Sequence, residues 1–177
     1  MANLLTALRL LLAAPVAWAF YQPQWMAGWL LLALLLLAIA TDMLDGIVAR
    51  SQGTASGNGQ LFDHGTDCLF VTAGLAGCAA AGLLPALLPL LIVVAFSQYV
   101  LDSRLVHRQK RLRMSALGRW NGILYYVPLV IVALARIDWL SGLSGHLLTL
   151  VILMAYALLL STILSILDRA LATRSEN

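Results

Sequence analysis

Four aspartates within one short stretch of the sequence could hold cations or accept a proton. Asp42 and Asp45 are three residues apart, and Asp63 and Asp67 are four apart. On helices each pair projects from one face, so two facing helices would bring four carboxylates together. Clustered carboxylates raise one another's pKa and stay ionised at neutral pH only beside cations. Two divalent ions would balance the four charges, and oxygen ligands of this kind favour Mg²⁺ or Mn²⁺.

The residues between the two acidic pairs fit a site for a phosphorylated ligand. Gly46 and Ala49 lie one turn beyond the first pair, and their small side chains would let a ligand approach the backbone. Arg50 has a planar fork suited to a phosphate group, and we expect it to end its helix. The segment 51–60 is polar and rich in glycine, which predicts a water-exposed connection. Gly59 would let the chain turn tightly into the second acidic helix.

The whole stretch resembles the signature of the CDP-alcohol phosphotransferase family. Its positions follow in the order Asp42, two residues, Asp45-Gly46, two residues, Ala49-Arg50, eight residues, Gly59, three residues, Asp63, three residues, Asp67. Every position of the signature is filled. Carboxylates that merely face solvent at a helix end would explain one pair, but not both pairs with the Gly, Ala and Arg between them.

The resemblance implies an activity and a set of roles. The family transfers a group from a CDP-linked alcohol, commonly CDP-diacylglycerol, to a second alcohol and releases CMP. By resemblance Asp67 is the base that accepts the proton of the attacking hydroxyl, and it also touches a metal. Asp42, Asp45 and Asp63 are then mainly ligands of two divalent cations, Mg²⁺ or Mn²⁺. The residues expected to border the CDP are Gly46, Ala49, Arg50 and Gly59.

A second, less specific pattern near the N-terminus resembles the family's Asn-x-x-Thr-x-x-Arg run. Asn3, Thr6 and Arg9 recur every three residues and share a helical face. The resemblance suggests that they help to hold the nucleotide, although Arg9 could instead snorkel to a lipid phosphate. Residues 17–19 mimic a signal-peptide cleavage site, but the early positive charge lies inside the apolar stretch rather than before it.

The composition predicts an all-α integral membrane protein. Of the 177 residues, 62% are hydrophobic and only 11% are charged, and the mean hydropathy is +0.90. Ordinary soluble domains carry about 25% charged residues. A span takes about 20 residues, so we expect one domain over 1–177, a bundle of six transmembrane helices with a short amphipathic N-terminal segment. The expected helices are 1–21, 26–48, 61–82, 84–103, 121–137 and 144–167.

The third of these helices has an unusual composition. Its small residues permit close helix packing in lipid, and they are Ala73, Gly74, Ala76, Gly77, Ala79, Ala80 and Gly82. The chain's two cysteines, Cys68 and Cys78, also lie in this helix. We interpret them as small core residues rather than as a disulfide or a metal site.

The basic residues are distributed asymmetrically. Six of the eleven Lys and Arg residues fall between Arg104 and Arg119. With six spans, both termini, the acidic stretch and this basic connection share one side, and every basic residue except Arg136 lies there or at its edge. The positive-inside rule makes that side cytoplasmic, and we expect a bacterial-type inner membrane. Arg136 and Asp138, on the other side, are expected to pair locally.

The basic connection 104–119 has two interpretations. It is either a positive-inside loop that touches anionic headgroups or the binding site of an anionic acceptor. Relatives that use phosphorylated acceptors carry basic residues in this region. By resemblance, Arg104 and Arg119 are therefore the candidates for contact with the acceptor.

The acceptor itself is less clearly indicated. Cys68 follows the last aspartate, where phosphatidylglycerophosphate synthases usually have Lys and inositol-phosphate-using relatives often have Arg. The run Asp63-His64-Gly65 resembles the choline and ethanolamine phosphotransferases, whose chains are typically much longer. We favour phosphatidyl transfer from CDP-diacylglycerol to a small polar alcohol, preferably a phosphorylated one. The alternative is transfer of a headgroup from a CDP-aminoalcohol to diacylglycerol.

A different class of protein remains open at this point. Intramembrane carboxylates also build divalent-cation and proton transporters, which need acids near the middle of the bilayer and broken helices. Here the acids are expected at helix ends, beside an arginine and a glycine-rich connection. The expected partners are a CDP-linked lipid donor, the alcohol acceptor and membrane lipids. A homodimer is also expected, and no nucleic acid.

Overall fold

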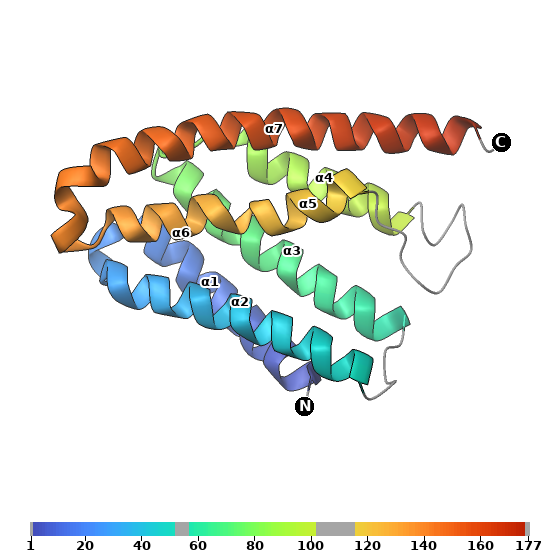
Figure 1. Cartoon of the computed structure of the whole chain (residues 1–177), viewed down its shortest axis with the longest axis horizontal. Coiled ribbons are helices and arrows are strands. Elements are labelled where there is room, and N and C mark those ends of the chain that lie inside the picture. The colour runs from blue at the N-terminus through green and yellow to red at the C-terminus, as the bar shows by residue number, and fades with distance from the viewer. Residues whose placement is uncertain (1, 52–56, 102–115, 176–177) are drawn as a thin grey trace.

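The computed structural model describes residues 2–51, 57–101 and 116–175, with side chains for 6–43, 59, 61–101 and 117–171. These ranges contain helices and short connections and no strand, which confirms the expected all-α fold (Figure 1). The helices are α1 (Ala2–Tyr21), α2 (Gly28–Ser51), α3 (Gly57–Ala80), α4 (Leu87–Leu101), α5 (Ala116–Leu124), α6 (Tyr126–Ala135) and α7 (Ser144–Ser175), and the short 3-10 helices are η1 (Pro23–Trp25) and η3 (Asp138–Leu143).

The fifth expected helix occurs as two pieces. α5 and α6 meet at Tyr125 and together form a 19-residue apolar run, Leu117–Ala135. Pro128 lacks the backbone N–H that would bond to the carbonyl of Leu124, and this missing donor explains the interruption. Because the two pieces continue each other, the order of helical rods along the chain matches the expected order.

Two of the described helical runs are long and apolar enough to cross a membrane. They are Leu117–Ala135 and the 34-residue run Asp138–Leu171. The apolar stretches Thr6–Tyr21, Gly28–Met43 and Leu87–Leu101 are shorter. The six transmembrane spans therefore stay a prediction.

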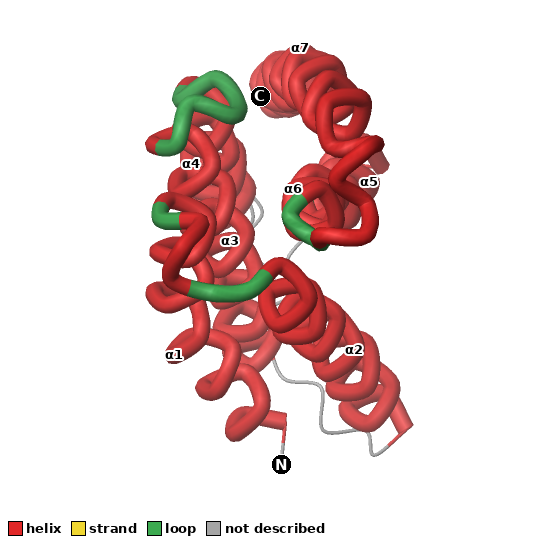
Figure 2. The backbone as a smooth tube through the Cα atoms, turned by 90° about the vertical axis from the view of Figure 1, so that its left-hand side faces the viewer, coloured by secondary structure: helices red, strands yellow, loops and turns green. Residues whose placement is uncertain are grey.

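The helices pack as two rows. Seen along the bundle, α1, α3 and α4 form one row, and α2, the α5–α6 rod and α7 form the other (Figure 2). Contacts run along each row, and they cross between α1 and α2, α3 and α6, and α4 and α7. α3 and α6 are therefore the central members of their rows. Side chains between α3 and α6 lie inside the bundle.

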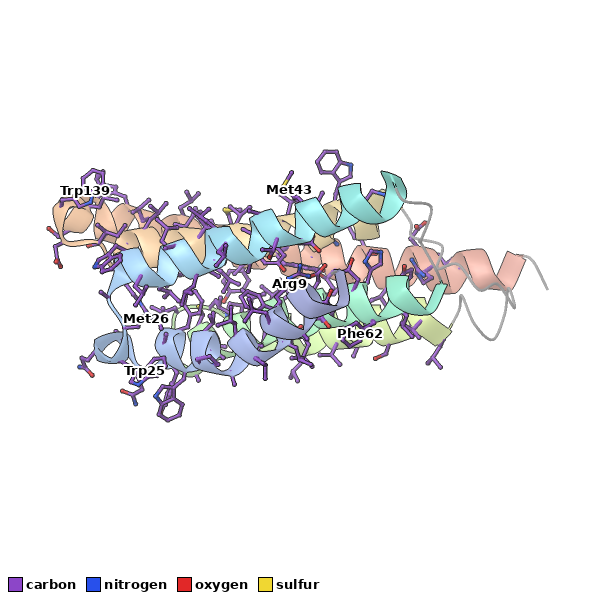
Figure 3. All side chains as sticks on the ribbon, turned by 90° about the horizontal axis from the view of Figure 1, so that it is seen from below. Arg9, Trp25, Met26, Met43, Phe62 and Trp139 are labelled. Carbon is purple, nitrogen blue, oxygen red and sulfur yellow. The ribbon has the colours of Figure 1, made fainter. Side chains whose placement is uncertain are left out.

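One end of the bundle gathers the segments that the sequence placed on one side. The ends of α2 and α4, the starts of α3 and α5 and the end of α7 lie together there (Figure 1). The opposite end carries η1 and η3, with the exposed side chains of Trp25 and Trp139 (Figure 3). The bundle therefore has two chemically distinct ends, and the aspartates lie toward the first of them.

α1 and α3 pack closely against each other. A Cβ atom at Gly77 would collide with the carbonyl oxygen of Ala17 and would lie 3.1 Å from Cβ of Phe20. A Cβ at Gly74 would lie 3.0 Å from a methyl group of Leu129 on α6. The expectation of close packing is confirmed at these two glycines, whereas Ala76 and Ala80 are exposed.

We expect Gly77→Ala to destabilise the fold by about 1–3 kcal/mol, because an added methyl group would force α1 away from α3. The measurement is thermal unfolding of the purified protein in detergent. The matched control is Gly122→Ala, since nothing lies within 4 Å of a Cβ at that position. If both variants melted at the same temperature, the close approach of α1 and α3 would not require a glycine.

At the far end of the bundle, Arg136 joins α6 to α1. Its guanidinium donates to the carbonyl oxygens of Ala19 and Phe20, each at 2.6 Å, and lies 5.5 Å from the centroid of the Phe20 ring. The expected pairing with Asp138 is wrong, since no ion pair joins the two among the described residues. The last carbonyl oxygens of a helix such as α1 accept no hydrogen bond from the helix itself. They also lie at the negative end of the helix dipole, so they attract a cation.

The acidic helices extend further than expected. α2 continues to Ser51 rather than ending at residue 48, and α3 begins at Gly57 rather than at residue 61. Gly59 therefore lies in the first turn of α3, and residue 51 and residues 57–60 of the expected connection are helical, with residues 52–56 outside the described part. Packing of an apolar face stabilises a helix more than the propensities of its terminal residues, so the glycines do not prevent helix formation here. The aspartates accordingly lie inside their helices and not at the tips.

Candidate active site

Arg9 of α1 lies at the centre of the aspartates. Its side chain is 1% exposed, and its Nη1 lies 3.1 Å from Oδ1 of Asp42 and 3.7 Å from Oδ1 of Asp63. The same nitrogen donates to Oδ1 of Asp67. α1, α2 and α3 thus each bring charged groups to one point within the bundle, where Arg9 is labelled in Figure 3. A buried guanidinium requires paired anions, and here three carboxylates supply them.

The position of Arg9 decides between two interpretations of the N-terminal pattern. A snorkelling arginine would extend its charged group to the lipid headgroups, whereas Arg9 is buried and paired with aspartates, so that interpretation is wrong. Thr6, one turn earlier and also buried, donates its hydroxyl to Oδ1 of Asp63 at 3.5 Å. Two of the three residues in the pattern therefore face the acidic site. The side chain of Asn3 lies outside the described part of the structure.

The structure brings together three of the four predicted aspartates. The side chains of Asp42, Asp63 and Asp67 are 34%, 28% and 22% exposed, respectively. They therefore surround Arg9 while keeping an accessible side toward which a ligand can approach. Asp45 follows Asp42 by three residues within α2, which places it on the same helical face. Its side chain lies outside the described part.

A metal ion could be held on the α3 side of this site. One ligand atom each from Asp63, His64 and Asp67 lies within 4.8 Å of the others. Carboxylate oxygens suit Mg²⁺ and Mn²⁺, and an imidazole nitrogen suits transition metals such as Mn²⁺ better than Mg²⁺. His64 was not predicted as a ligand from the sequence, although its place between the two aspartates of α3 was the available signal. The donor set fits a divalent cation.

Tyr126 of α6 is a second residue that sequence reasoning missed. Its ring stacks against Phe70, with centroids 6.3 Å apart and planes at 27°. Its hydroxyl is buried, makes no hydrogen bond within the described structure, and interacts electrostatically with Asp67 and Arg9. A tyrosine within an otherwise apolar helix could have indicated a functional residue. The neighbouring Tyr125 fits the same description, however, and its hydroxyl contacts Thr162 instead.

The remaining predicted residues lie around this centre or outside the described part. Arg119 is exposed in the first turn of α5, at the same end of the bundle as the aspartates. Arg104 lies outside the described residues. The other predicted nucleotide contacts lie near the end of α2 and the start of α3, and they are Gly46, Ala49, Arg50 and Gly59. Of these four residues, the structure describes the burial of Gly59 alone.

The sequence model of the CDP-alcohol phosphatidyltransferase family matches residues 1–169. The chain belongs to this family. The match includes α1 with Arg9 as well as both acidic helices, and it confirms the resemblance that the acidic signature carried. No solved structure matches the chain.

A curated relative of this CDP-alcohol phosphatidyltransferase comes from Cereibacter sphaeroides. It is described as a CDP-diacylglycerol–glycerol-3-phosphate 3-phosphatidyltransferase, and it is 30% identical over 149 residues. The alignment covers 80% of this chain and 67% of the relative. Family and relative together identify a transferase of phospholipid synthesis that acts on CDP-alcohols, rather than a transporter.

Proposed function

We propose that this CDP-alcohol phosphatidyltransferase transfers the phosphatidyl group of CDP-diacylglycerol to the hydroxyl of a small polar alcohol and releases CMP. The observation that carries the proposal is the convergence of Asp42, Asp63 and Asp67 from two helices on one partly open point. A pyrophosphate needs cations around it, and clustered carboxylates recruit them. Arg9, the one buried cation among the described side chains, leaves most of the negative charge for divalent ions to balance.

The outer surface of the bundle supports a location in a membrane. Large apolar side chains are exposed along most of the helices, for example Leu11 on α1, Leu90 on α4 and Leu153 on α7. Soluble monomers rarely expose apolar surface on this scale, whereas lipid tails would cover it. The exposed Trp25 and Trp139 at the far end fit the aromatic belt of a membrane interface. The basic residues near the acidic end would then make that end cytoplasmic, in a bacterial-type inner membrane.

The proposed chemistry assigns one step to each group of residues. When bound, two divalent cations, Mg²⁺ or Mn²⁺, would neutralise the pyrophosphate and stabilise the leaving CMP. Asp42, Asp45, Asp63 and Asp67 would hold them. Asp67 would also accept the proton of the acceptor's hydroxyl, whose oxygen attacks the phosphorus that carries diacylglycerol. The bond from that phosphorus to the CMP oxygen breaks.

The nucleotide is proposed to lie over the ends of α1, α2 and α3 nearest the aspartates. The hydrogen bond of Thr6 to Asp63 supports this placement, because it brings the N-terminal pattern to the edge of the acidic site. The other proposed contacts to the CDP are Asn3, Gly46, Ala49, Arg50 and Gly59. The acyl chains of the donor would lie along the apolar outer surface while the nucleotide stays in water.

Glycerol 3-phosphate is the first acceptor to consider, because the Cereibacter sphaeroides relative is named for it. The residue that follows Asp67 in the sequence is Cys68, which carries no positive charge. Its Sγ lies 3.8 Å from Oγ1 of Thr72. A phosphorylated acceptor would therefore have to be bound by charges from other segments. Arg104 and Arg119 from the basic connection are the proposed ones.

The experiment that tests the proposal measures CMP release by the purified protein supplied with CDP-diacylglycerol. Glycerol 3-phosphate, inositol phosphate, serine and inositol are screened as acceptors. A parallel reaction contains CDP-choline and diacylglycerol, because the Asp63-His64-Gly65 run left headgroup transfer as the alternative. CMP release with an acceptor in the first set supports the proposal. Release only in the parallel reaction would replace it with headgroup transfer.

We expect Arg119→Ala to raise the acceptor's KM about tenfold, the effect of losing one charge-assisted hydrogen bond. The KM for CDP-diacylglycerol should change far less, and Arg104→Ala should behave in the same way. The control is Arg169→Ala, which removes a cation of α7 that lies over the ring of Tyr99 on α4. Equal effects of Arg119→Ala on both KM values would favour the lipid-contact interpretation of the basic segment.

A homodimer is also proposed. Ala76 and Ala80 are small and exposed on α3, and small residues let helices of two chains approach closely in lipid. Cross-linking of the protein in intact membranes would test this, with a monomer-only pattern as the contrary result.

A further inference from the structure

Two buried groups beside the aspartates hold donors with no hydrogen-bond partner among the described residues. They are the guanidinium of Arg9, at Nε and Nη2, and the hydroxyl of Tyr126. Arg9 directs only its Nη1 at the three carboxylates. Buried donors are nearly always paired in native proteins, so unpaired ones at a binding site indicate a ligand that accepts from them.

Packing between α3 and α6 holds the ring of Tyr126 against the helix that carries Asp63 and Asp67. The ring lies against Phe70, which follows Asp67 by almost one turn on α3. The phenol interacts electrostatically with Asp67, Arg9, Asp42 and Asp63, the same charged groups that meet at the site centre. Tyr126 therefore lies on the face of α6 that packs against α3, the helix that carries Asp63 and Asp67.

We propose that the hydroxyl of Tyr126, together with Nε and Nη2 of Arg9, donates to phosphate oxygens of the bound CDP-alcohol. The inference rests on the proposed function and adds residues that bind the phosphates directly, beside those that hold cations. The carboxylates cannot accept hydrogen bonds from all these donors, because their oxygens would coordinate the proposed cations. Phosphate oxygens carry distributed negative charge, and an arginine fork with a phenol hydroxyl matches them.

The adjacent Tyr125 provides a matched control. Its hydroxyl lies 2.7 Å from Oγ1 of Thr162 on α7, so its hydrogen bond is already made within the protein. Both tyrosines lose one oxygen on substitution by phenylalanine, and both are largely buried. They differ in whether the hydroxyl has a partner in the protein or is free for a ligand.

The test is calorimetric binding of CMP and of cytidine to the purified protein with Mg²⁺, and of Mn²⁺ alone. Tyr126→Phe is expected to weaken CMP binding about tenfold. Cytidine, which lacks the phosphate, should bind the variant as it binds the unmodified protein, and the Mn²⁺ affinity should not change. Tyr125→Phe should leave all three affinities unchanged and lower the melting temperature instead.

The outcomes separate this inference from the proposed function. If the unmodified protein bound no CMP, the proposed function itself would be wrong. If it bound CMP and Tyr126→Phe bound equally well, only the role of Tyr126 would be overturned. A parallel loss of Mn²⁺ affinity would also overturn it, because the hydroxyl would then support the carboxylates. Should Tyr126→Phe not fold, Tyr126→Leu, which also lacks the hydroxyl, is measured in its place, and CMP binding equal to that of the unmodified protein would refute the inference.

Discussion

Asp67→Asn is expected to lower the rate of CMP release by roughly 10²–10⁴-fold, the range for removing a general base. Asn cannot accept the proton of the attacking hydroxyl, and it is a poorer ligand for a divalent cation. The substitution keeps the size of the side chain. Its amide oxygen can still accept from Arg9, which donates to Oδ1 of Asp67 in the structure, so the protein should fold. The measurement is CMP release in a single turnover, with thermal unfolding in parallel.

Asp138→Asn is the control for this prediction. It removes one carboxylate from the exposed η3 segment at the opposite end of the bundle, so CMP release should be unaffected. Two results would contradict the assignment of Asp67. Full activity of folded Asp67→Asn would show that another group accepts the proton. An equal loss in Asp138→Asn would show that any lost carboxylate harms the protein.

Removal of divalent cations is expected to stop the reaction completely, and Mg²⁺ or Mn²⁺ should restore it. Without them, the aspartates face a doubly charged pyrophosphate, and arginine side chains alone do not offset the repulsion, so binding of the donor becomes unfavourable. CMP release is measured in excess chelator and then as each ion is titrated back. Turnover that persists in chelator would contradict the two-cation site.

The fold should survive the chelator, and this distinguishes loss of the ions from unfolding. Arg9 pairs with Asp42, Asp63 and Asp67, so the carboxylates keep a partner when the ions are removed. We therefore expect the melting temperature to fall only slightly in chelator. A collapse of the melting temperature would mean that the ions stabilise the bundle, and the loss of activity would then be indirect.

The acidic signature illustrates what sequence can predict about a site of this kind. Spacings of three and four residues within a helix place side chains on one face whatever the surrounding fold, so Asp42 with Asp45 and Asp63 with Asp67 were recognisable pairs. Composition likewise predicts an all-helical chain, because long apolar stretches with few charges leave little alternative. The helix ends were predicted less well: packing extended α2 and α3 into the glycine-rich segment, and terminal residues alone do not determine where a helix stops.

Only the tertiary structure showed what completes the site. Arg9 lies 58 residues from Asp67 along the chain and was expected to touch nucleotide or lipid, yet the packing of α1 against α3 turns it onto the aspartates. Tyr126 packs its ring against Phe70 on the helix of Asp63 and Asp67, while the chemically identical Tyr125 turns to Thr162. Residue types and local periodicity therefore determined which groups could do the chemistry. The rotation and close approach of helices distant in sequence, which depend on contacts such as that of Gly77 with Ala17, decided which of them meet.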